Sequence, residues 1–191
     1  NTPVVTPPNL IDYSCDPVTA LVATQKTAAF VNQHELYPDT QLPVLTYERW
    51  ILTVDGESNE LNVAILRPHQ GTPILGVNMT NHGQSDDQAT KPFSQGVNLY
   101  WMNQVARRGY ISVAVARRGN FGSTGKMYYT QTDSQKLSDY YMNLMKYQAA
   151  SVMAVMDKMA NDPAYKPYMS TVLLDGTSGG SDTVMQVAAD S

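Results

Sequence analysis

The sequence has 191 residues, which is enough for one domain with a substantial core and too few for two full domains. Its composition is that of a folded protein, because 42% of the residues are hydrophobic and only 16% are charged. The formal net charge of −4 disfavours a nucleic-acid partner, since phosphate binding needs clustered basic side chains and the arginine pairs at 107–108 and 117–118 are isolated.

No apolar run approaches the roughly 18 residues that a membrane span needs, so we expect no membrane span. The sequence starts NTPVVTPP without Met, as a mature exported protein or a trimmed chain would, and we expect a secreted or periplasmic protein. The single cysteine, Cys15, cannot form a disulfide within these residues. It is a buried or free thiol, or it pairs with a cysteine elsewhere.

The first part of the chain predicts an extension followed by a β-hairpin. Prolines, which fix φ and lack an N–H, make residues 1–43 irregular apart from a short helix within 17–31. The segments 44–54 and 60–68 are rich in β-branched and aromatic residues, and the turn signal Asp55-Gly56-Glu57-Ser58-Asn59 lies between them. We therefore predict two antiparallel strands joined by that turn.

From residue 72 onwards, strand patterns alternate with helix patterns. The expected strands are 72–81, 110–116 and 170–176, and the expected helices are 93–109, 137–159 and 182–190. Gly109 is suited to end the first helix, Asp133 or Ser134 to cap the long one, and Asn161-Asp162-Pro163 to stop it. This alternation predicts an α/β fold with right-handed crossovers and a parallel sheet that helices cover on both faces.

The segment Gly176-Thr177-Ser178-Gly179-Gly180 matches G-x-S-x-G between a predicted strand and a predicted helix. A serine nucleophile in such a turn needs glycine neighbours because the turn is tight, and the following helix directs free N–H groups at an oxyanion. The pattern alone is weak, since a glycine-rich turn can be a simple connection. Strand, helix and spacing together favour a nucleophile elbow with Ser178 as the nucleophile.

A second glycine-containing turn, Asn81-His82-Gly83-Gln84, follows the predicted strand 72–81. Backbone N–H groups that stabilise an oxyanion must approach the substrate closely, which favours glycine at such a place. The turn is therefore a candidate for the second part of an oxyanion hole. An ordinary turn with a surface histidine is the alternative.

The segment 117–126 resembles a phosphate loop, but its spacing is wrong. Gly119 and Gly125 enclose five residues instead of four, and Met127 stands where Ser or Thr would bind magnesium. The glycines are also evenly three apart, unlike those of a dinucleotide fingerprint. We expect no nucleotide here.

The histidines give no sign of a metal site. His34, His69 and His82 lack companion ligands at metal-site spacing, so we expect no metal and no cofactor. Solvation or helix capping is the expected role of Asp86 and Asp87, which follow the second glycine-containing turn.

Taken in chain order, these features resemble the α/β-hydrolase superfamily: the hairpin, the His82-Gly83 turn, Arg118-Gly119-Asn120-Phe121-Gly122-Ser123, the long helix and Gly176-Thr177-Ser178-Gly179-Gly180. The similarity is closest to the dienelactone-hydrolase-like and prolyl-oligopeptidase-like branches, and it covers about residues 44–190. Such proteins often carry Arg-Gly-x-Gly-x-Ser after the fourth strand, and the stretch here has one residue more.

This resemblance implies a serine hydrolase that acts on esters, thioesters, lactones or amides, with a small-molecule ester or a peptide-like compound as its substrate. Ser178 would attack the carbonyl carbon and form an acyl-enzyme. The N–H of Gly179, with that of Gln84 or Gly83, would stabilise the oxyanion, which is typically worth ~3–4 kcal/mol per donor.

The superfamily places its acid and its histidine after the nucleophile, but no histidine follows Ser178. Asp182 and Asp190 both fall on the helix that begins at the elbow, so neither suits the role of the acid. His82 is conceivable as a base, but it belongs to the oxyanion turn. We therefore expect the base and the acid outside this chain segment.

The expected fold has a corresponding gap, because ending at Ser191 would leave the strand 170–176 as an exposed edge. We predict that residues 44–191 are the N-terminal half of an α/β-hydrolase domain, an incomplete α/β-hydrolase fold that a missing C-terminal half or a companion chain completes. A catalytically silent hydrolase-like scaffold that binds a ligand or a protein is one alternative. A self-sufficient module with a rearranged sheet is another.

Overall fold

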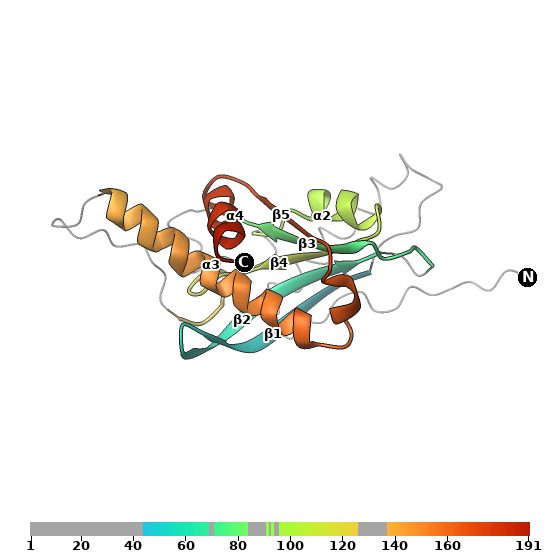
Figure 1. Cartoon of the computed structure of the whole chain (residues 1–191), viewed down its shortest axis with the longest axis horizontal. Coiled ribbons are helices and arrows are strands. Elements are labelled where there is room, and N and C mark those ends of the chain that lie inside the picture. Colours follow the sequence, from blue (N-terminus) through green and yellow to red (C-terminus); the bar gives the residue numbers. More distant parts are fainter. Residues whose placement is uncertain (1–43, 69–70, 84–90, 92, 94–95, 126–136) are drawn as a thin grey trace, which may run out of the picture.

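The computed structural model describes residues 44–68, 71–83, 91, 93, 96–125 and 137–191, which form one mixed sheet flanked by helices (Figure 1). Its strands lie in the order β1-β2-β4-β3-β5. They are β1 (Val44–Val54), β2 (Glu57–Arg67), β3 (Gly76–Asn81), β4 (Tyr110–Val115) and β5 (Val172–Gly176). The helices are α2 (Leu99–Ala106), α3 (Leu137–Asn161) and α4 (Gly179–Asp190), and the short 3-10 helix η2 (Lys166–Tyr168) precedes β5.

Several predicted features lie outside the described residues. They are the extension 1–43 with its helix and Cys15, the possible caps Asp133 and Ser134, His34, His69, Gln84, and the pair Asp86 and Asp87. The division of the chain into residues 1–43 and 44–191 therefore stays a prediction.

The predicted hairpin is confirmed, with a tighter turn than expected. β1 and β2 pair antiparallel from Val44 with Arg67 to Val54 with Glu57. Asp55 and Gly56 alone form the turn, and both have positive φ, 51° and 81°. Such a two-residue turn matches the twist of the strands, so pairing continues to Glu57 instead of starting at residue 60.

The strands behind the hairpin form the parallel part of the sheet. β2 is antiparallel to β4, whereas β3 is parallel to both β4 and β5. β3 begins at Gly76, not at residue 72. Pro73 has no N–H to donate, and Leu75 N donates instead to Gly109 O at 2.7 Å, outside the ladder.

The helix after β3 is shorter than predicted, because Asn98 caps it. The side chain of Asn98 accepts a hydrogen bond from Trp101 N at 3.1 Å, so α2 starts at Leu99 instead of residue 93. After α2, the chain turns at Gly109, which has φ 90°, and enters β4. None of the helices in the described part of the chain is both long and apolar enough to cross a membrane.

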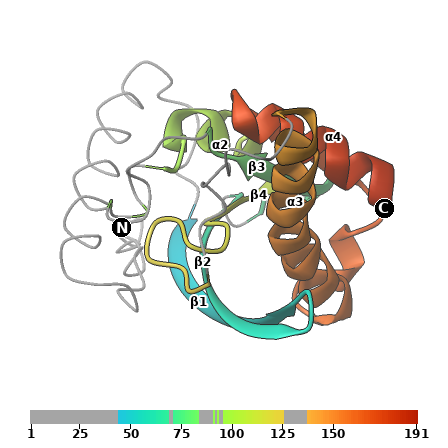
Figure 2. The same cartoon turned by 90° about the vertical axis from the view of Figure 1, so that its left-hand side faces the viewer.

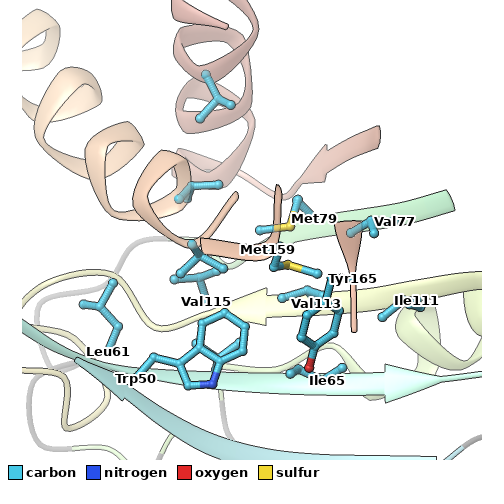
Figure 3. Close-up of a cluster of buried hydrophobic side chains, with 14 of the residues drawn as sticks. Trp50, Leu61, Ile65, Val77, Met79, Ile111, Val113, Val115, Met159 and Tyr165 are labelled. Atoms are coloured by element: carbon cyan, nitrogen blue, oxygen red, sulfur yellow. The ribbon is translucent and has the colours of Figure 1, made fainter. Parts of the chain in front are cut away.

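Helices cover both faces of the sheet, as predicted (Figure 2). Along β3, Val77 and Met79 face α3 and α4, so the alternate residues Asn78 and Thr80 face the side of α2. The core under α3 and α4 includes the side chains labelled in Figure 3: Trp50, Leu61, Ile65, Val77, Met79, Ile111, Val113, Val115, Met159 and Tyr165. Val152, Val155 and Val187 from the two helices belong to the same core. The core on the α2 side includes Tyr47, Leu66, Phe93, Val97, Met102 and Phe121.

Replacing Gly56 by Ala is expected to lower the free energy of unfolding by about 1–2 kcal/mol, because alanine is strained at positive φ. No atom lies within 4 Å of a Cβ at this position, so the loss would come from the backbone alone. Gly56→Asn is the matched control, since asparagine tolerates this conformation better. Urea unfolding measures both variants, and a Gly56→Ala protein as stable as wild type would contradict the two-residue turn.

Candidate active site

β5 passes into α4 through a sharp turn at Thr177 and Ser178. Ser178 has φ 54° and ψ −126°, a combination that costs a non-glycine residue about 1–3 kcal/mol. Among the described non-glycine residues, only Asp55 and Phe121 share a positive φ. The backbone strain thus lies at the serine of the predicted nucleophile elbow.

Close backbone packing requires glycine on both sides of Ser178. A Cβ at Gly176 would strike the carbonyl of Gly180. A Cβ at Gly180 would lie 2.7 Å from the carbonyl oxygen of His82 and closer still to that of Asn81. β5, the first turn of α4 and the end of β3 therefore touch backbone to backbone, and a side chain at either glycine would force them apart.

Some amide N–H groups of the turn donate hydrogen bonds to other described residues, and one does not. Thr177 N donates to Asn81 O at 3.3 Å, and Gly180 N donates to Thr177 O at 2.9 Å. The N–H of Gly179, the first residue of α4, donates no hydrogen bond to any described residue. This N–H lies at the positive end of the helix dipole. The turn therefore presents a donor directly beside Ser178.

The side chain of Ser178 is exposed and makes no hydrogen bond within the part of the chain that the structure describes. Asp182 and Asp190 lie on α4, as expected, the first in its opening turn and the second at its end. Neither carboxylate is hydrogen-bonded to the hydroxyl of Ser178. The hydroxyl is open to a ligand, and no base among these residues is hydrogen-bonded to it.

The turn after β3 lies against the elbow, as the sequence predicts for two parts of one site. A Cβ at Gly83 would lie 3.5 Å from the Cβ of Ser178 and 3.2 Å from the carbonyl oxygen of Thr177. Glycine at this place keeps the turn close to the serine. The other expected donor, Gln84, falls outside the described residues.

His82 contacts Arg117 and shows no hydrogen bond to Ser178. Its Nδ1 lies 2.7 Å from Gly83 O and 2.9 Å from Nη2 of Arg117, and its ring meets Phe121 edge to face at 4.8 Å between centroids. Burial and the Arg117 charge lower the pKa of His82 well below its ordinary 6.5, while the bond to Gly83 O raises it in part. The imidazole is therefore neutral at neutral pH.

Arg117, two residues after the end of β4, is buried to 1% exposure and connects three segments. Its Nη2 donates to the carbonyl oxygens of His82 (3.0 Å) and Gly83 (3.1 Å). Its Nη1 donates to Oε1 of Gln148 on α3 (3.1 Å) and to Oγ1 of Thr183 on α4 (2.6 Å). Sequence reasoning missed this role by treating Arg117 as half of an isolated basic pair. The available signal was a charged residue directly after a buried strand.

The segment 117–125 folds onto the hairpin. The Ser123 hydroxyl donates to Ala116 O (2.7 Å) and accepts from Asn62 N (2.9 Å), and Asn62 Nδ2 donates to Phe121 O (2.8 Å). Most of the amide donors that a phosphate would need are engaged within the protein: those of Gly119, Asn120, Ser123 and Thr124. The segment therefore serves as a connection that places Phe121 against His82.

A pocket of about 480 Å³ adjoins the elbow on the α2 side of the sheet. It is lined by Thr80, Asn81, His82, Gly83, Gly96, Val97, Asn98, Trp101, Asp175, Gly176 and Thr177. The Asp175 carboxylate accepts hydrogen bonds from Asn78 Nδ2 at 2.8 Å and from Thr80 Oγ1. Within the described ranges, no group of three or more His, Cys, Asp or Glu residues could hold a metal ion.

A family model described as X-Pro dipeptidyl-peptidase (S15 family) matches residues 55–144. The match runs from the β1–β2 turn into α3, a little under half of the chain, and does not reach Ser178. A comparison with curated protein sequences gives no significant match.

Solved structures of α/β serine hydrolases have a similar fold. A Coxiella burnetii α/β serine hydrolase homologue matches with a TM-score of 0.51 and 17% identity, over 75% of this chain and 57% of that one. A Xanthomonas campestris α/β serine hydrolase without a lid matches with a TM-score of 0.53 and 16% identity, over 75% of this chain and 56% of that one. The chain thus spans just over half the length of these structures. The described residues therefore have a fold similar to that of α/β serine hydrolases.

Replacing Ser178 by Gly is expected to raise the free energy of unfolding by about 1–2 kcal/mol, because glycine adopts φ 54° without strain. Ser178→Ala removes the same hydroxyl but keeps the Cβ, and therefore keeps the strain. Urea unfolding of both variants isolates the backbone effect. Equal stability of the two would mean that the backbone at Ser178 is relaxed.

Acidification is expected to destabilise the protein through His82. Its pKa is lowered by folding, so the unfolded chain binds the proton first, and stability falls as pH drops below about 6.5, by at most ~1.4 kcal/mol per pH unit. The free energy of unfolding should fall less steeply with decreasing pH in His82→Gln. His34 and His69 are present in both proteins, so the difference between the two unfolding curves from pH 7 to 5 reports His82. Parallel curves would contradict this prediction.

Proposed function

We propose that this protein is a serine hydrolase that forms an acyl-enzyme on Ser178. The strained backbone of Ser178 at the start of α4 is the observation that carries the proposal. Such strain persists only where the surrounding structure imposes it, and it is concentrated at functional sites. Here it accompanies an exposed hydroxyl beside the N-terminal end of a helix, which is the arrangement of a nucleophile elbow.

In the proposed reaction, Oγ of Ser178 attacks the substrate carbonyl carbon while its proton passes to a base. The negative charge that develops on the carbonyl oxygen is stabilised by the N–H of Gly179 and by a second N–H, from Gly83 or Gln84. Collapse of this intermediate breaks the bond to the alcohol or amine, which leaves with the proton from the base. Water then hydrolyses the ester on Ser178 and restores the hydroxyl.

The base and its acid partner are proposed to come from outside this chain segment. His82 supports this, because the hydrogen bonds of its ring go to Arg117 and Gly83 and none of them goes to Ser178. A C-terminal half or a companion chain is the proposed source. β5 is the edge strand of the described sheet, and Leu173 on it is 41% exposed, so this edge is open to such a partner.

The proposed substrates are carboxylic esters and amides. The fold is compatible with both, because the same attack on a carbonyl carbon serves either leaving group. The family match over residues 55–144 is to a dipeptidyl-peptidase model, which favours including peptides with proline in second position.

A fluorophosphonate probe tests the nucleophile. In the complete natural protein, the probe is expected to label Ser178, and Ser178→Ala is expected to abolish labelling and to lower hydrolysis of p-nitrophenyl acetate or Gly-Pro-p-nitroanilide at least ~1,000-fold. Mass spectrometry of the labelled peptide identifies the site.

Thr177→Ser is the matched control, because it changes the neighbouring exposed side chain and leaves Ser178 intact. It should be labelled like wild type. Labelling that persists in Ser178→Ala would assign the nucleophile elsewhere. A folded wild-type protein that neither reacts nor hydrolyses would instead favour the catalytically silent scaffold.

A further inference from the structure

Arg117 holds the turn after β3 and the helix after the elbow in one arrangement. One nitrogen of its guanidinium, Nη2, donates to the carbonyl oxygens of His82 and Gly83 at 3.0 and 3.1 Å. The other, Nη1, donates to Gln148 and Thr183. Because the guanidinium is planar and its donors form a rigid fork, bonds on both sides fix the turn relative to the helices.

Thr183 connects Arg117 to Gly179, the proposed oxyanion donor, through a second hydrogen bond. Oγ1 of Thr183 accepts a hydrogen bond from Arg117 at 2.6 Å, and its hydroxyl donates to Gly179 O or to Gln148 Oε1, each at 3.0 Å. Thr183 is fully buried on the first turns of α4, so it has little freedom to move. Arg117 is thereby connected to the residue that follows Ser178.

The bonds to the turn also direct its amides. In a planar trans peptide the C=O and the N–H point to opposite sides, so holding His82 O towards Arg117 directs the N–H of Gly83 away from it. Gly83 is the residue whose Cβ position lies 3.5 Å from the Cβ of Ser178. The orientation of this amide beside the serine is therefore coupled to the guanidinium.

We propose that Arg117 is a positioning residue that sets the geometry of the oxyanion hole by holding the His82-Gly83 turn against the first turns of α4. This inference rests on the proposed serine hydrolase function. Arg117 touches no substrate in this role. It acts through the backbone of the turn and through Thr183.

The adjacent Arg118 provides a matched control. It is also buried, at 2% exposure, but its Nη atoms donate to Val54 O, Asp55 and Tyr147 O, and its guanidinium stacks 3.8 Å from the Tyr147 ring centroid. These contacts join the hairpin turn to α3 and include no residue of the site. Arg118→Met should therefore lower the melting temperature without changing the chemistry.

The test measures ester hydrolysis and hydrogen exchange in the complete natural protein. Arg117→Met is expected to lower kcat about 100-fold with KM within about threefold, because misplacing the donors affects the transition state more than ground-state binding. Arg117→Lys keeps the positive charge but lacks the forked donors, so its kcat should lie between those of wild type and Arg117→Met. Exchange of a peptide covering residues 79–83 should be faster in Arg117→Met, and Arg118→Met should match wild type in kcat and in this exchange.

The outcomes separate the two proposals. An Arg117→Met protein with wild-type kcat and wild-type exchange at 79–83 overturns the positioning role. A wild type that no probe labels overturns the hydrolase proposal, and exchange then still decides whether Arg117 orders the turn. If Arg117→Met does not fold, Thr183→Val and Thr183→Ser decide, since only the second keeps the hydroxyl. Thr183→Val should lose about tenfold in kcat and Thr183→Ser should recover it, and equal values in both would overturn the inference.

Discussion

The site depends on three backbone segments meeting with no side chain between them. The end of β3, the end of β5 and the first turn of α4 approach so closely that a Cβ at Gly176 or Gly180 would strike a carbonyl. Parallel strands bring their carboxyl ends to one edge of a sheet, which is why loops from distant parts of the sequence can build one site there. Glycine makes the contact possible, and Ser178 lies between these glycines in a strained conformation.

Two adjacent buried arginines stabilise different parts of this arrangement. A buried cation is costly unless its donors are satisfied, and both guanidinium groups have several partners. Arg117 joins the His82-Gly83 turn to α3 and α4, whereas Arg118 joins the hairpin turn to α3. One supports the site and the other the sheet, although a single peptide bond separates them.

Polar groups also occupy the α2 face of the sheet beside the pocket. Asn78, Thr80 and Asp175 form a hydrogen-bonded group across β3 and β5, and Ser112 on β4 lies 3.3 Å from the Asn78 amide. The opposite face of the same strands carries Val77 and Met79 in a continuous apolar core. Both faces of the sheet therefore carry an apolar core, but only the α2 face combines it with polar side chains and with the pocket next to Ser178.

The sequence by itself determined the element types, the hairpin and the elbow. Asp55-Gly56 and the glycines around Ser178 are local signals, because positive φ and close backbone approach depend on residue type at the turn itself. The ends of the elements were less predictable. β3 begins four residues later than predicted, and α2 begins only at Leu99 because the Asn98 side chain caps it. Such ends are decided by a few competing hydrogen bonds.

Only the tertiary structure decided what Arg117 and His82 do. The residues that Arg117 binds are 31 to 66 positions away in sequence, and no local pattern specifies such contacts. The neutral state of His82 likewise arises from burial and a nearby charge, both of which depend on how the chain packs. Local conformational preference depends on the types of neighbouring residues, whereas desolvation and long-range hydrogen bonds exist only once distant segments have come together.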